Sequence, residues 1–556
     1  MTLPLIVLAV LAVLVLGYTV YGRFVARALG LDDGRRTPAH ERKDGVDFVP
    51  TPPFYLFAQH FSAIAAAGPI VGPILACQAF GWLPCLLWIA VGVVVIGAVH
   101  DASTLAASVR HGARSVAEIC RDEVGPRAGL AMLAFIWLAL LFVIVAFADT
   151  TAGTFVTGPE ELAGSAPGFH PGGAVAAASV MYLLLSIVMG FVQRLLRPPL
   201  WLVTVLFVPA TFGVAWLGTE VSEVLLLSRA GWGVLILLYC GVASVTPVWA
   251  LLQPRGYLGG FVLYAALAIG LIGIFFGGHA VQQPAFTGFH SPGLTGALFP
   301  FLFVTIACGA CSGFHGLVCS GTTSKQLDRE SHARPVGYGA MLAEGLVAVI
   351  ALSTIMILSP DEARALPPGT IYGQGLGRFL TLLIGKEHLA FAVTFGAMAF
   401  STFVFDTLDV STRLGRLILQ ELFGWKGRFG AAVATVATLA LPAWLLSFTE
   451  SGGWRLYWTL FGASNQLLAA LSLLVVTVWL ARARRPVAFT LVPLVFVLAI
   501  TLWALLELLV DGARRAQGLD VAAVNALVAA ALVVLALFLV LRAVPRVLAA
   551  RRAPGG

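Results

Sequence analysis

The sequence carries little charge for its length. Only 11% of its 556 residues are charged and 59% are apolar, whereas ordinary soluble domains carry about 25% charged residues. This deficit excludes a soluble globular protein. Cysteine is also scarce, because seven residues are too few for a disulfide scaffold and most of them lie inside apolar runs. We interpret the cysteines as small hydrophobic residues.

Long polar segments are missing as well. The longest stretches between apolar runs are 23–53 and 359–387, and neither reaches the size of a small domain, about 50 residues. A soluble catalytic or signalling domain is therefore excluded, and we expect a single membrane domain.

What the sequence has in abundance is apolar runs of about 18 residues or more, long enough to cross a bilayer as helices. We count fifteen of them. They cover residues 3–22, 60–80, 84–108, 129–156, 173–193, 200–218, 231–252, 257–276, 296–318, 337–358, 388–411, 429–447, 456–480, 487–508 and 522–542. The first run lacks the basic region and cleavage site of a signal peptide, so we interpret it as a spanning helix.

The connecting segments are strongly asymmetric in positive charge. If the chain starts outside, 27 of the 34 Lys and Arg residues fall in loops on the cytoplasmic side and seven on the other side. Because Lys and Arg accumulate on the cytoplasmic side of membranes, this predicts a periplasmic N-terminus and a cytoplasmic C-terminus. The formal charge of +7 then reflects the basic residues of the cytoplasmic loops, and no nucleic-acid partner is expected.

The second apolar run contains two Gly-Pro pairs, Gly68-Pro69 and Gly72-Pro73. Proline removes a backbone donor and glycine weakens a helix, so we expect this span to be broken near the middle of the membrane. A tolerated proline kink is the alternative. Broken spans persist where the freed backbone groups face protein, water or a solute, and transporters use them to bind substrates or ions.

A similar interruption is expected five spans later, in the seventh run. The segment 242–249, VASVTPVW, combines small residues with a proline. Five is odd, so the two broken spans would enter the membrane from opposite sides, as in an inverted repeat. We therefore expect an all-α polytopic membrane protein of about 15 helices with a 5+5 repeat. The predicted parts are 1–53 (first helix and basic loop), 54–220 (first half), 230–425 (second half with a cytoplasmic surface helix near its end) and 428–556 (peripheral helices).

The segment from Thr305 to Gly316 is unusually rich in small and hydroxyl-bearing residues, and SGTT follows at 320–323. Small residues permit close helix contact, and hydroxyls can bind an ion or cap a helix. Its C-x-x-C pair lies in an apolar run without a second Cys/His pair at ligand spacing, so we expect no metal site. The phosphate-loop spacing is also missing around Lys325.

Ionisable residues at membrane depth are costly and point to function. The candidates are His60, His100, Asp101, Asp149, His315, Glu344, Asp406, Asp409 and Glu507. Asp406 and Asp409 share a helical face with Arg413 close to it, so a packing salt bridge is the alternative there. The pair His100-Asp101 and Glu507 lie nearer to span ends, where interfacial solvation is the simpler explanation.

Several long strings resemble a known family. They are HFSAIAAAGPIVGP at 60–73, the stretch 301–315 with 320–323, GYGAM at 337–341, the stretch 406–416 and FGASNQ at 461–466. These strings closely resemble the bacterial carbon starvation protein A family of inner-membrane transporters, from about residue 50 to 510. One departure is His100, where the family commonly has Gln, so we do not expect a shared proton site there.

The resemblance implies nutrient uptake during carbon starvation. Members of the family are described as peptide transporters, and close relatives are pyruvate–proton symporters. The family is grouped with the amino acid–polyamine–organocation carriers, which implies a LeuT-like fold and agrees with the repeat inferred from hydropathy. The sequence leaves open the choice between peptide and pyruvate, the coupling ion and the oligomeric state.

Two other classes compete with a carrier. An intramembrane enzyme would need a nucleophile–base or metal signature, and the sequence has no H-E-x-x-H motif or comparable signature. A nutrient-sensing receptor would be expected to carry a soluble signalling domain. We therefore expect neither catalytic residues nor a cofactor.

We place the substrate between the two interrupted spans, with half-helix N-termini favouring a carboxylate. The predicted substrate residues are His60, Gly68, Pro69, Gly72, Pro73, Ser244, Thr246, Trp249 and His315. If the coupling ion is H⁺, the candidate titrating residues are His315, Asp406 and Asp409. If it is Na⁺, the candidate ligands are the backbone carbonyls of Ala65–Gly68 and the hydroxyls of Thr305 and Ser312.

Overall fold

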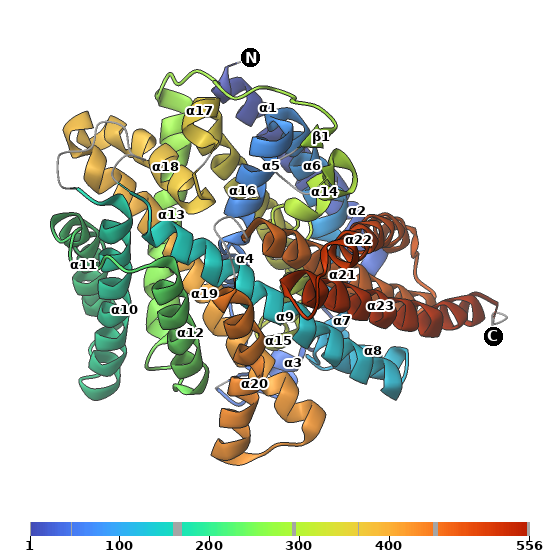
Figure 1. Ribbon diagram of the computed structural model, residues 1–556. Coiled ribbons are helices and arrows are strands. Elements are labelled where there is room, and N and C mark those ends of the chain that lie inside the picture. Colours follow the sequence, from blue (N-terminus) through green and yellow to red (C-terminus); the bar gives the residue numbers. More distant parts are fainter. Residues whose placement is uncertain are drawn as a thin grey trace.

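The computed structural model describes residues 2–552 apart from 46, 159–168, 292–295, 365 and 449–453. The described chain is a bundle of helices with one two-stranded sheet (Figure 1). The elements up to the end of the second predicted span are α1 (Leu3–Leu16), η1 (Gly17–Tyr21), α2 (Gly22–Leu29), α3 (Pro38–Glu41), α4 (Pro53–Ile64) and α5 (Gly68–Phe80).

The middle of the chain continues the helical pattern. It comprises α6 (Trp82–Gly92), η2 (Val93–Gly97), α7 (Ala98–Arg110), α8 (Val116–Glu123), α9 (Pro126–Phe155), α10 (Pro171–Leu195), α11 (Leu200–Glu220), α12 (Arg229–Val245) and α13 (Leu252–Phe276). A short hairpin of β1 (His290–Ser291) and β2 (Gly296–Ala297) follows, with antiparallel pairing.

The last part begins with two short helices, α14 (Leu298–Thr305) and α15 (Gly313–Gly321). It continues with η4 (Thr323–Lys325), η5 (Glu330–His332), η6 (Arg334–Gly339), α16 (Ala340–Met356), α17 (Pro360–Ala363), α18 (Pro368–Ile384), η7 (Lys386–His388), α19 (Leu389–Phe423), α20 (Gly427–Ser447), α21 (Trp454–Arg482), α22 (Ala488–Arg515) and α23 (Val521–Arg552).

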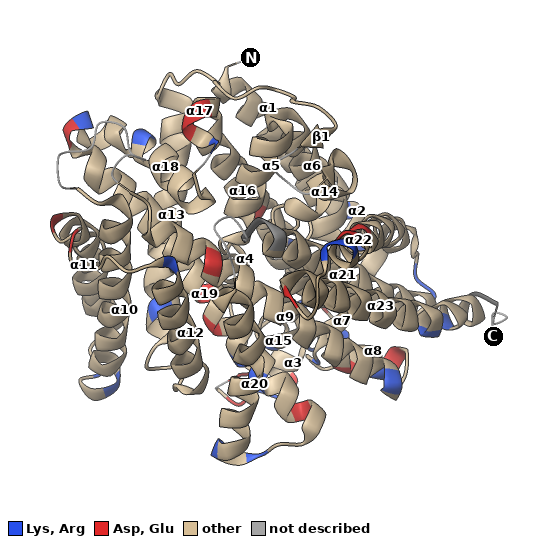
Figure 2. Cartoon of the chain, in the orientation of Figure 1, with Lys and Arg blue, Asp and Glu red and all other residues tan. Residues whose placement is uncertain are grey.

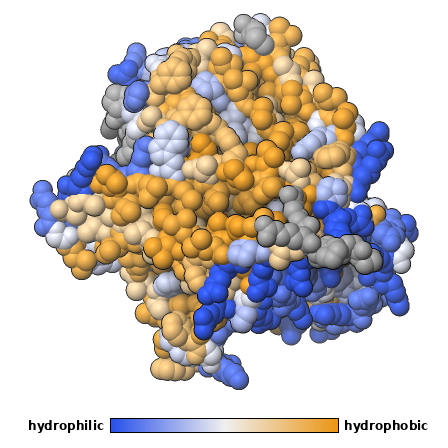
Figure 3. Space-filling model, turned by 90° about the vertical axis from the view of Figure 1, so that its right-hand side faces the viewer, coloured by the Kyte–Doolittle hydropathy of each residue, from blue (hydrophilic) through white to orange (hydrophobic). Residues whose placement is uncertain are grey.

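Twelve helices in the described residues are long and apolar enough to cross a membrane, or thirteen if the bent pair α4–α5 counts as one span. The sequence-based count of fifteen is therefore not confirmed. All fifteen predicted runs contain helix, but α12 has only 17 residues, and the run 296–318 is divided between α14 and α15. Much of the face shown in Figure 3 is apolar, with a hydrophilic region at its lower right, and most charged residues lie near helix ends and connections (Figure 2).

The break predicted in the second span is present. Helices α4 and α5 meet at a 47° bend, and the residues between them are Ala65–Ala67. The break precedes the first Gly-Pro pair because Pro69 occupies the first turn of α5, where its missing N–H costs no helical hydrogen bond. Pro73 is accommodated inside α5.

The break predicted at 242–249 is wrong. Helix α12 is regular up to Val245 and ends there, and a turn leads into α13. Thr246 precedes Pro247 and adopts an extended conformation with φ −68° and ψ 139°, as residues before proline prefer. The proline therefore ends a span instead of interrupting one. The second broken span is the pair α14–α15, whose connection covers 306–312.

Two further expectations need correction. The surface helix predicted near 413–424 does not exist as a separate element, because α19 runs without interruption for 35 residues. The region 428–556 is not wholly peripheral either, because every residue in the most apolar 18-residue window of α21 is buried. Helix α21 packs against α9, α15 and α22, so it is part of the core.

Candidate functional site

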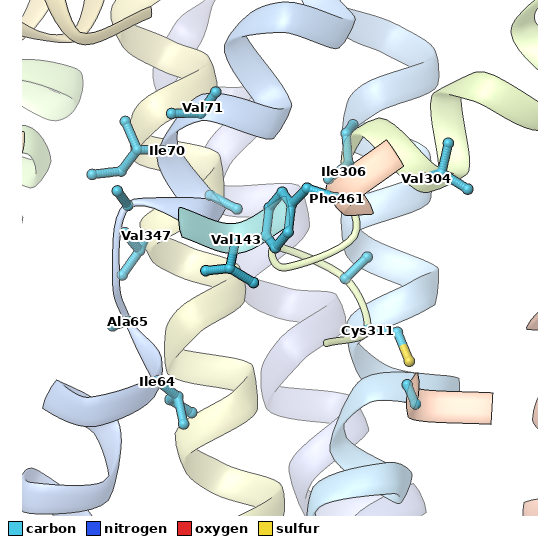
Figure 4. Close-up of a cluster of buried hydrophobic side chains, with 14 of the residues drawn as sticks. Ile64, Ala65, Ile70, Val71, Val143, Val304, Ile306, Cys311, Val347 and Phe461 are labelled. Carbon is cyan, nitrogen blue, oxygen red and sulfur yellow. The ribbon is translucent and has the colours of Figure 1, made fainter. Parts of the chain in front are cut away.

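The two broken spans pack against each other through glycines of α5. A Cβ at Gly68 would overlap Sγ of Cys308, and one at Gly72 would lie 2.5 Å from the carbonyl oxygen of Thr305. Glycine is thus required at both positions for the backbones to approach this closely. Figure 4 shows the two breaks, marked by Ala65 and Ile306, within one cluster of buried apolar side chains.

Helix α21 satisfies polar groups that the second break leaves without helical partners. Nε1 of Trp458 donates to the carbonyl of Thr305 at 3.1 Å, and Nε2 of Gln466 donates to the carbonyl of Phe303 at 3.0 Å. The amide of Phe314, at the start of α15, donates to Oδ1 of Asn465 at 2.9 Å. The string FGASNQ thus holds the broken span open, because unpaired backbone groups at membrane depth are costly.

A cluster of ionisable side chains lies beside these breaks, and we call it the His315 cluster. Its members are His100, Asp101, His315 and Glu344, from α7, α15 and α16, and all four are at most 1% exposed. Nδ1 of His315 donates to Oδ2 of Asp101 at 2.9 Å, and its Nε2 lies 3.1 Å from Oε2 of Glu344. Nδ1 of His100 donates to the other oxygen of Asp101 at 2.7 Å.

The cluster extends toward the first break through His60, which lies one turn before the end of α4. Nδ1 of His60 is hydrogen-bonded to Oγ1 of Thr323 at 2.8 Å, and Sγ of Cys319 lies 3.9 Å from Nε2. The same sulfur donates to the carbonyl of Asp101 at 3.6 Å. His60 and His315, both predicted as substrate residues, therefore belong to one buried polar region.

The His315 cluster is suited to holding and releasing a proton. An imidazole with a carboxylate at each ring nitrogen can donate to both only when it is protonated. Loss or gain of a proton changes the charge of a buried group, which is expensive at low dielectric. A proton that binds or leaves here would therefore be accompanied by a change in solvent access or by the arrival of a compensating charge.

A second ionic cluster lies between α13 and α19. Nη2 of Arg255 contacts Oδ1 of Asp406 at 2.6 Å and Oδ2 of Asp409 at 2.9 Å. The hydroxyl of Tyr239 donates to Oδ2 of Asp409 at 2.8 Å. Arg413, which we had placed near the aspartates, instead donates to carbonyls at the end of α12. The partner of the aspartates is thus Arg255.

The structure does not bring the segment 244–249 to the first break. The hydroxyl of Ser244 faces that of Thr435 at 3.3 Å, and the half-buried Thr246 donates to its own helix at Val242. Trp249 packs against Phe191 and lies under the guanidinium of Arg194. These contacts belong to the end of the bundle formed by the α10–α11 and α12–α13 connections (Figure 1).

The residues predicted for a Na⁺ site have separate environments. Ala65 caps the end of α4, and the hydroxyl of Ser312 accepts from Nδ2 of Asn465 at 3.1 Å. The buried hydroxyl of Thr305 has no hydrogen-bond partner among the described residues. Within the same part of the chain, no group of three or more His, Cys, Asp or Glu side chains is arranged to hold a metal ion.

Sequence reasoning undervalued three residues. Asp101 was assigned to a membrane interface, yet it lies nine residues before the end of α7 and is fully buried. Glu344 was noticed only as an ionisable residue in a span. Arg255 falls between the predicted apolar runs 231–252 and 257–276 and is counted there as a cytoplasmic loop residue, whereas α13 already begins at Leu252. For all three residues, the signal in the sequence was an ionisable side chain close to apolar residues.

An apolar helical bundle with two broken spans and buried ionisable clusters defines the chain as a polytopic membrane protein of the transporter class. The chain belongs to the carbon starvation protein CstA family, whose family model matches residues 2–374 and 365–504. It is accordingly a membrane transporter and not an enzyme.

Relatives within the family are similar over most of their length. A peptide transporter CstA from Bacillus subtilis is 33% identical, with 88% of each chain covered. The pyruvate/proton symporter BtsT of Escherichia coli is 32% identical, covering 90% of this chain and 81% of its own. Among solved structures, a manganese transporter of Eremococcus coleocola has 12% identity and a TM-score of 0.40, covering 91% of this chain and 99% of its own.

Proposed function

We propose that the protein is a secondary active carrier for small carboxylate-bearing nutrients, either peptides or pyruvate, with H⁺ as the coupling ion. The observation that carries this proposal is the His315 cluster, a titratable group enclosed beside two broken spans. The names of the relatives, a peptide transporter and a pyruvate/proton symporter, support the same substrates and ion. Uptake during carbon starvation across the bacterial inner membrane is the expected setting.

The substrate is proposed to bind at the junction of the broken spans. Helix α5 begins at Gly68 and α15 at Gly313, so two half-helix N-termini lie at this junction. Helix N-termini carry partial positive charge and favour a carboxylate. His60 and His315 supply polar contacts nearby. Ser244, Thr246 and Trp249, which the sequence analysis included, are left out because their segment lies at another end of the bundle.

The coupling proton is proposed to bind at His315 with its two carboxylates, and Asp406 with Asp409 forms the second candidate. Both sites are buried groups in which one proton changes the local charge. Such a change can be offset by moving a substrate carboxylate or by altering access to water. A symporter requires this kind of coupling, in which the charge of the bound proton offsets the charge of the bound substrate.

The arrangement in the membrane is also part of the proposal. The distribution of Lys and Arg supports a periplasmic N-terminus and a cytoplasmic C-terminus. An inverted repeat is retained, but its second half would begin at α14 instead of near residue 230. If the 17-residue α12 is counted as a span, six apolar helices separate α5 from α14, and the two broken spans would still enter from opposite sides.

Transport by the full chain in proteoliposomes tests the proposal. An inside-alkaline pH gradient should drive accumulation of labelled pyruvate or of a labelled dipeptide. His315→Gln and Glu344→Gln should abolish the response to the gradient, whereas Glu507→Gln should keep it, because the half-buried Glu507 accepts a hydrogen bond from Trp503 of its own helix. Normal pH-driven accumulation by His315→Gln would contradict the assignment of the proton site.

Coupling to Na⁺ is a second candidate, favoured by one observation. The hydroxyl of Thr305 is buried at the second break without a partner among the described residues, and oxygen ligands suit a hard cation. Replacing Na⁺ by choline at fixed pH distinguishes the two ions. An unchanged rate would eliminate Na⁺ coupling.

A further inference from the structure

Arg255 is a buried guanidinium with unused hydrogen-bonding capacity. Its side chain is 1% exposed, and both of its acidic partners contact the same atom, Nη2. Nε and Nη1 have no acceptor among the described residues. Unpaired buried donors on a charged group are costly, so this arrangement points to an acceptor that arrives from outside the chain.

The geometry of the guanidinium defines what that acceptor is. A carboxylate binds arginine most strongly through two parallel N–H donors along one edge of the planar group. Both such edges of Arg255 include Nη2, which the two aspartates already share. An incoming carboxylate can therefore occupy a full edge only if one aspartate gives up its contact with Nη2.

The two aspartates differ in their freedom to move. Asp409 is 0% exposed and is fixed by the hydroxyl of Tyr239. Asp406 is 27% exposed, and α13 packs closely only against its Oδ2, which would lie 3.2 Å from a Cβ at Gly259. Asp406 is thus the partner that can be displaced.

The helix that carries Arg255 also contacts the first broken span. Gly260 of α13 lies against Ser62 of α4, with its added Cβ 3.8 Å from the hydroxyl oxygen. Ser62 is three residues before Ala65, where the break begins. Arg255 therefore lies on a helix that packs against the first half of this span.

The charged side chains around Arg255 sum to zero net charge. Arg255 of α13 and Arg413 of α19 oppose Asp406 and Asp409 of α19, with neutral Tyr182 from α10 and Tyr239 and Cys240 from α12 completing the surroundings. A bound carboxylate would add one negative charge. One proton on Asp406 restores the balance and weakens its hold on Arg255.

We propose that Arg255 binds the carboxylate of the transported solute in exchange for Asp406, which takes up one proton as it leaves. The proton comes from water and is released to water when Asp406 returns to Nη2, and no bond other than O–H is made or broken. This inference rests on the proposed function and deepens it. It places the solute carboxylate at Arg255 instead of at the half-helix N-termini, selects Asp406 from the two candidate proton sites, and gives a stoichiometry of one proton for each carboxylate.

Exchange and accumulation of labelled pyruvate, and separately of labelled alanyl-alanine, test the inference in proteoliposomes. Arg255→Met should lower exchange at least about 10-fold, and Arg255→Lys should restore it only in part because lysine lacks the planar fork. Asp406→Asn mimics the protonated state, so exchange should persist and become independent of pH between about pH 6 and pH 8. Its accumulation driven by a pH gradient should be lost. The control Arg514→Lys should behave as the wild type.

Several outcomes separate this inference from the proposed function. If the wild type exchanges neither solute, the proposed function and the inference both fail. If the wild type exchanges a solute and Arg255→Met does so at a rate within about 2-fold, only the inference is overturned. Retained pH-driven accumulation by Asp406→Asn overturns it as well. If Arg255→Met does not fold, the double variant Arg255→Met/Asp406→Asn removes both charges of the pair, and normal exchange by that folded variant would overturn the inference.

Discussion

His315 and Asp101 are 214 positions apart in the chain, and their side chains are joined by a 2.9 Å hydrogen bond in the interior of the bundle. The contact links α15, the second half of a broken span, to the continuous helix α7. A change in the charge of either residue therefore acts on the element whose break forms the proposed binding site. The following predictions examine this core and the regions around it.

Substitution of Gly72 should block transport. A Cβ at this position would lie 2.5 Å from the carbonyl oxygen of Thr305, and backbone atoms there have little room to shift. Gly72→Ala should reduce uptake at least about 10-fold and destabilise the fold by about 1–3 kcal/mol, the usual cost of overpacking. Gly213→Ala, where a Cβ meets no atom within 4 Å, is the matched control. Uptake by Gly72→Ala at the control's rate would contradict the close approach of the two spans.

The His315 cluster should show strong coupling in stability. His315→Gln removes the cation between two buried carboxylates, and breaking a buried pair in this way typically costs about 3–5 kcal/mol. Adding Glu344→Gln removes one of the uncompensated carboxylates, so the double variant should unfold at a higher temperature than His315→Gln alone. Thermal unfolding in detergent measures both. Additive losses in the double variant would mean that the two side chains do not interact.

A salt bridge outside the spans should make stability depend on pH. His111 has an acceptor at each ring nitrogen, the carbonyl of Ala107 at 2.7 Å and Oε1 of Glu123 at 3.0 Å. Burial lowers the pKa of His111, but these two hydrogen bonds outweigh it and the pKa is raised above 6.5. Burial raises the pKa of Glu123, but its bonds to His111 and Arg482 outweigh this, and the pKa lies below 4.5.

The sign of the pH effect follows from these directions. The stabilisation from His111 is complete below pH 6.5 and is lost as the pH rises through its raised pKa, while that from Glu123 is complete above pH 4.5 and is lost on acidification. The loss of folding stability caused by His111→Gln, about 1 kcal/mol, should be largest between pH 4.5 and pH 6.5 and should become smaller at alkaline pH. His388→Gln, whose side chain is 59% exposed, is the control. A difference in melting temperature that stays the same from pH 6.5 to alkaline pH would refute the charged pair.

Substitution at the end of α12 should leave transport intact. Thr246 is half-buried, and its hydroxyl donates to the carbonyl of Val242 in its own helix through a hydrogen bond that is exposed to solvent. Thr246→Ala should therefore retain uptake within about 2-fold, since an exposed hydroxyl bonded back to its helix contributes little. Initial uptake rates at equal protein content provide the measurement. A severe loss would return the 244–249 segment to the substrate site.

Local sequence was sufficient for the first broken span and insufficient for the second. The Gly-Pro pairs at 68–69 and 72–73 act on their own backbone, so their effect could be predicted without knowledge of the fold. The connection at 306–312 contains no proline, and its open conformation depends on contacts from α21, such as that between Trp458 and Thr305. The proline in 242–249 led to a wrong prediction. Hydropathy gives only approximate limits for a span, so a proline that ends a span cannot be told from one that interrupts it.

Individual residues of the candidate site could be predicted from the sequence, but their partners could not. His60 and His315 were identified because charge inside an apolar run is conspicuous. Their partners come from α7, α15 and α16 and from the segment after α15, and no spacing in the sequence relates Asp101 to His315 or Arg255 to Asp409. Burial by neighbouring elements determines which ionisable residues meet, and that information arises only in the folded bundle.

The burial of the most apolar 18-residue window of α21 has a consequence for the biogenesis of the protein. This segment, which faces protein in the final structure, must still enter the membrane before α22 and α23, which pack against α21 and follow it in the chain. During synthesis its polar residues, including Asn465 and Gln466, are therefore left without part of their final enclosure. Chains that stop before α23 should be retained by membrane quality control and degraded, because the core closes only when the last helices have arrived.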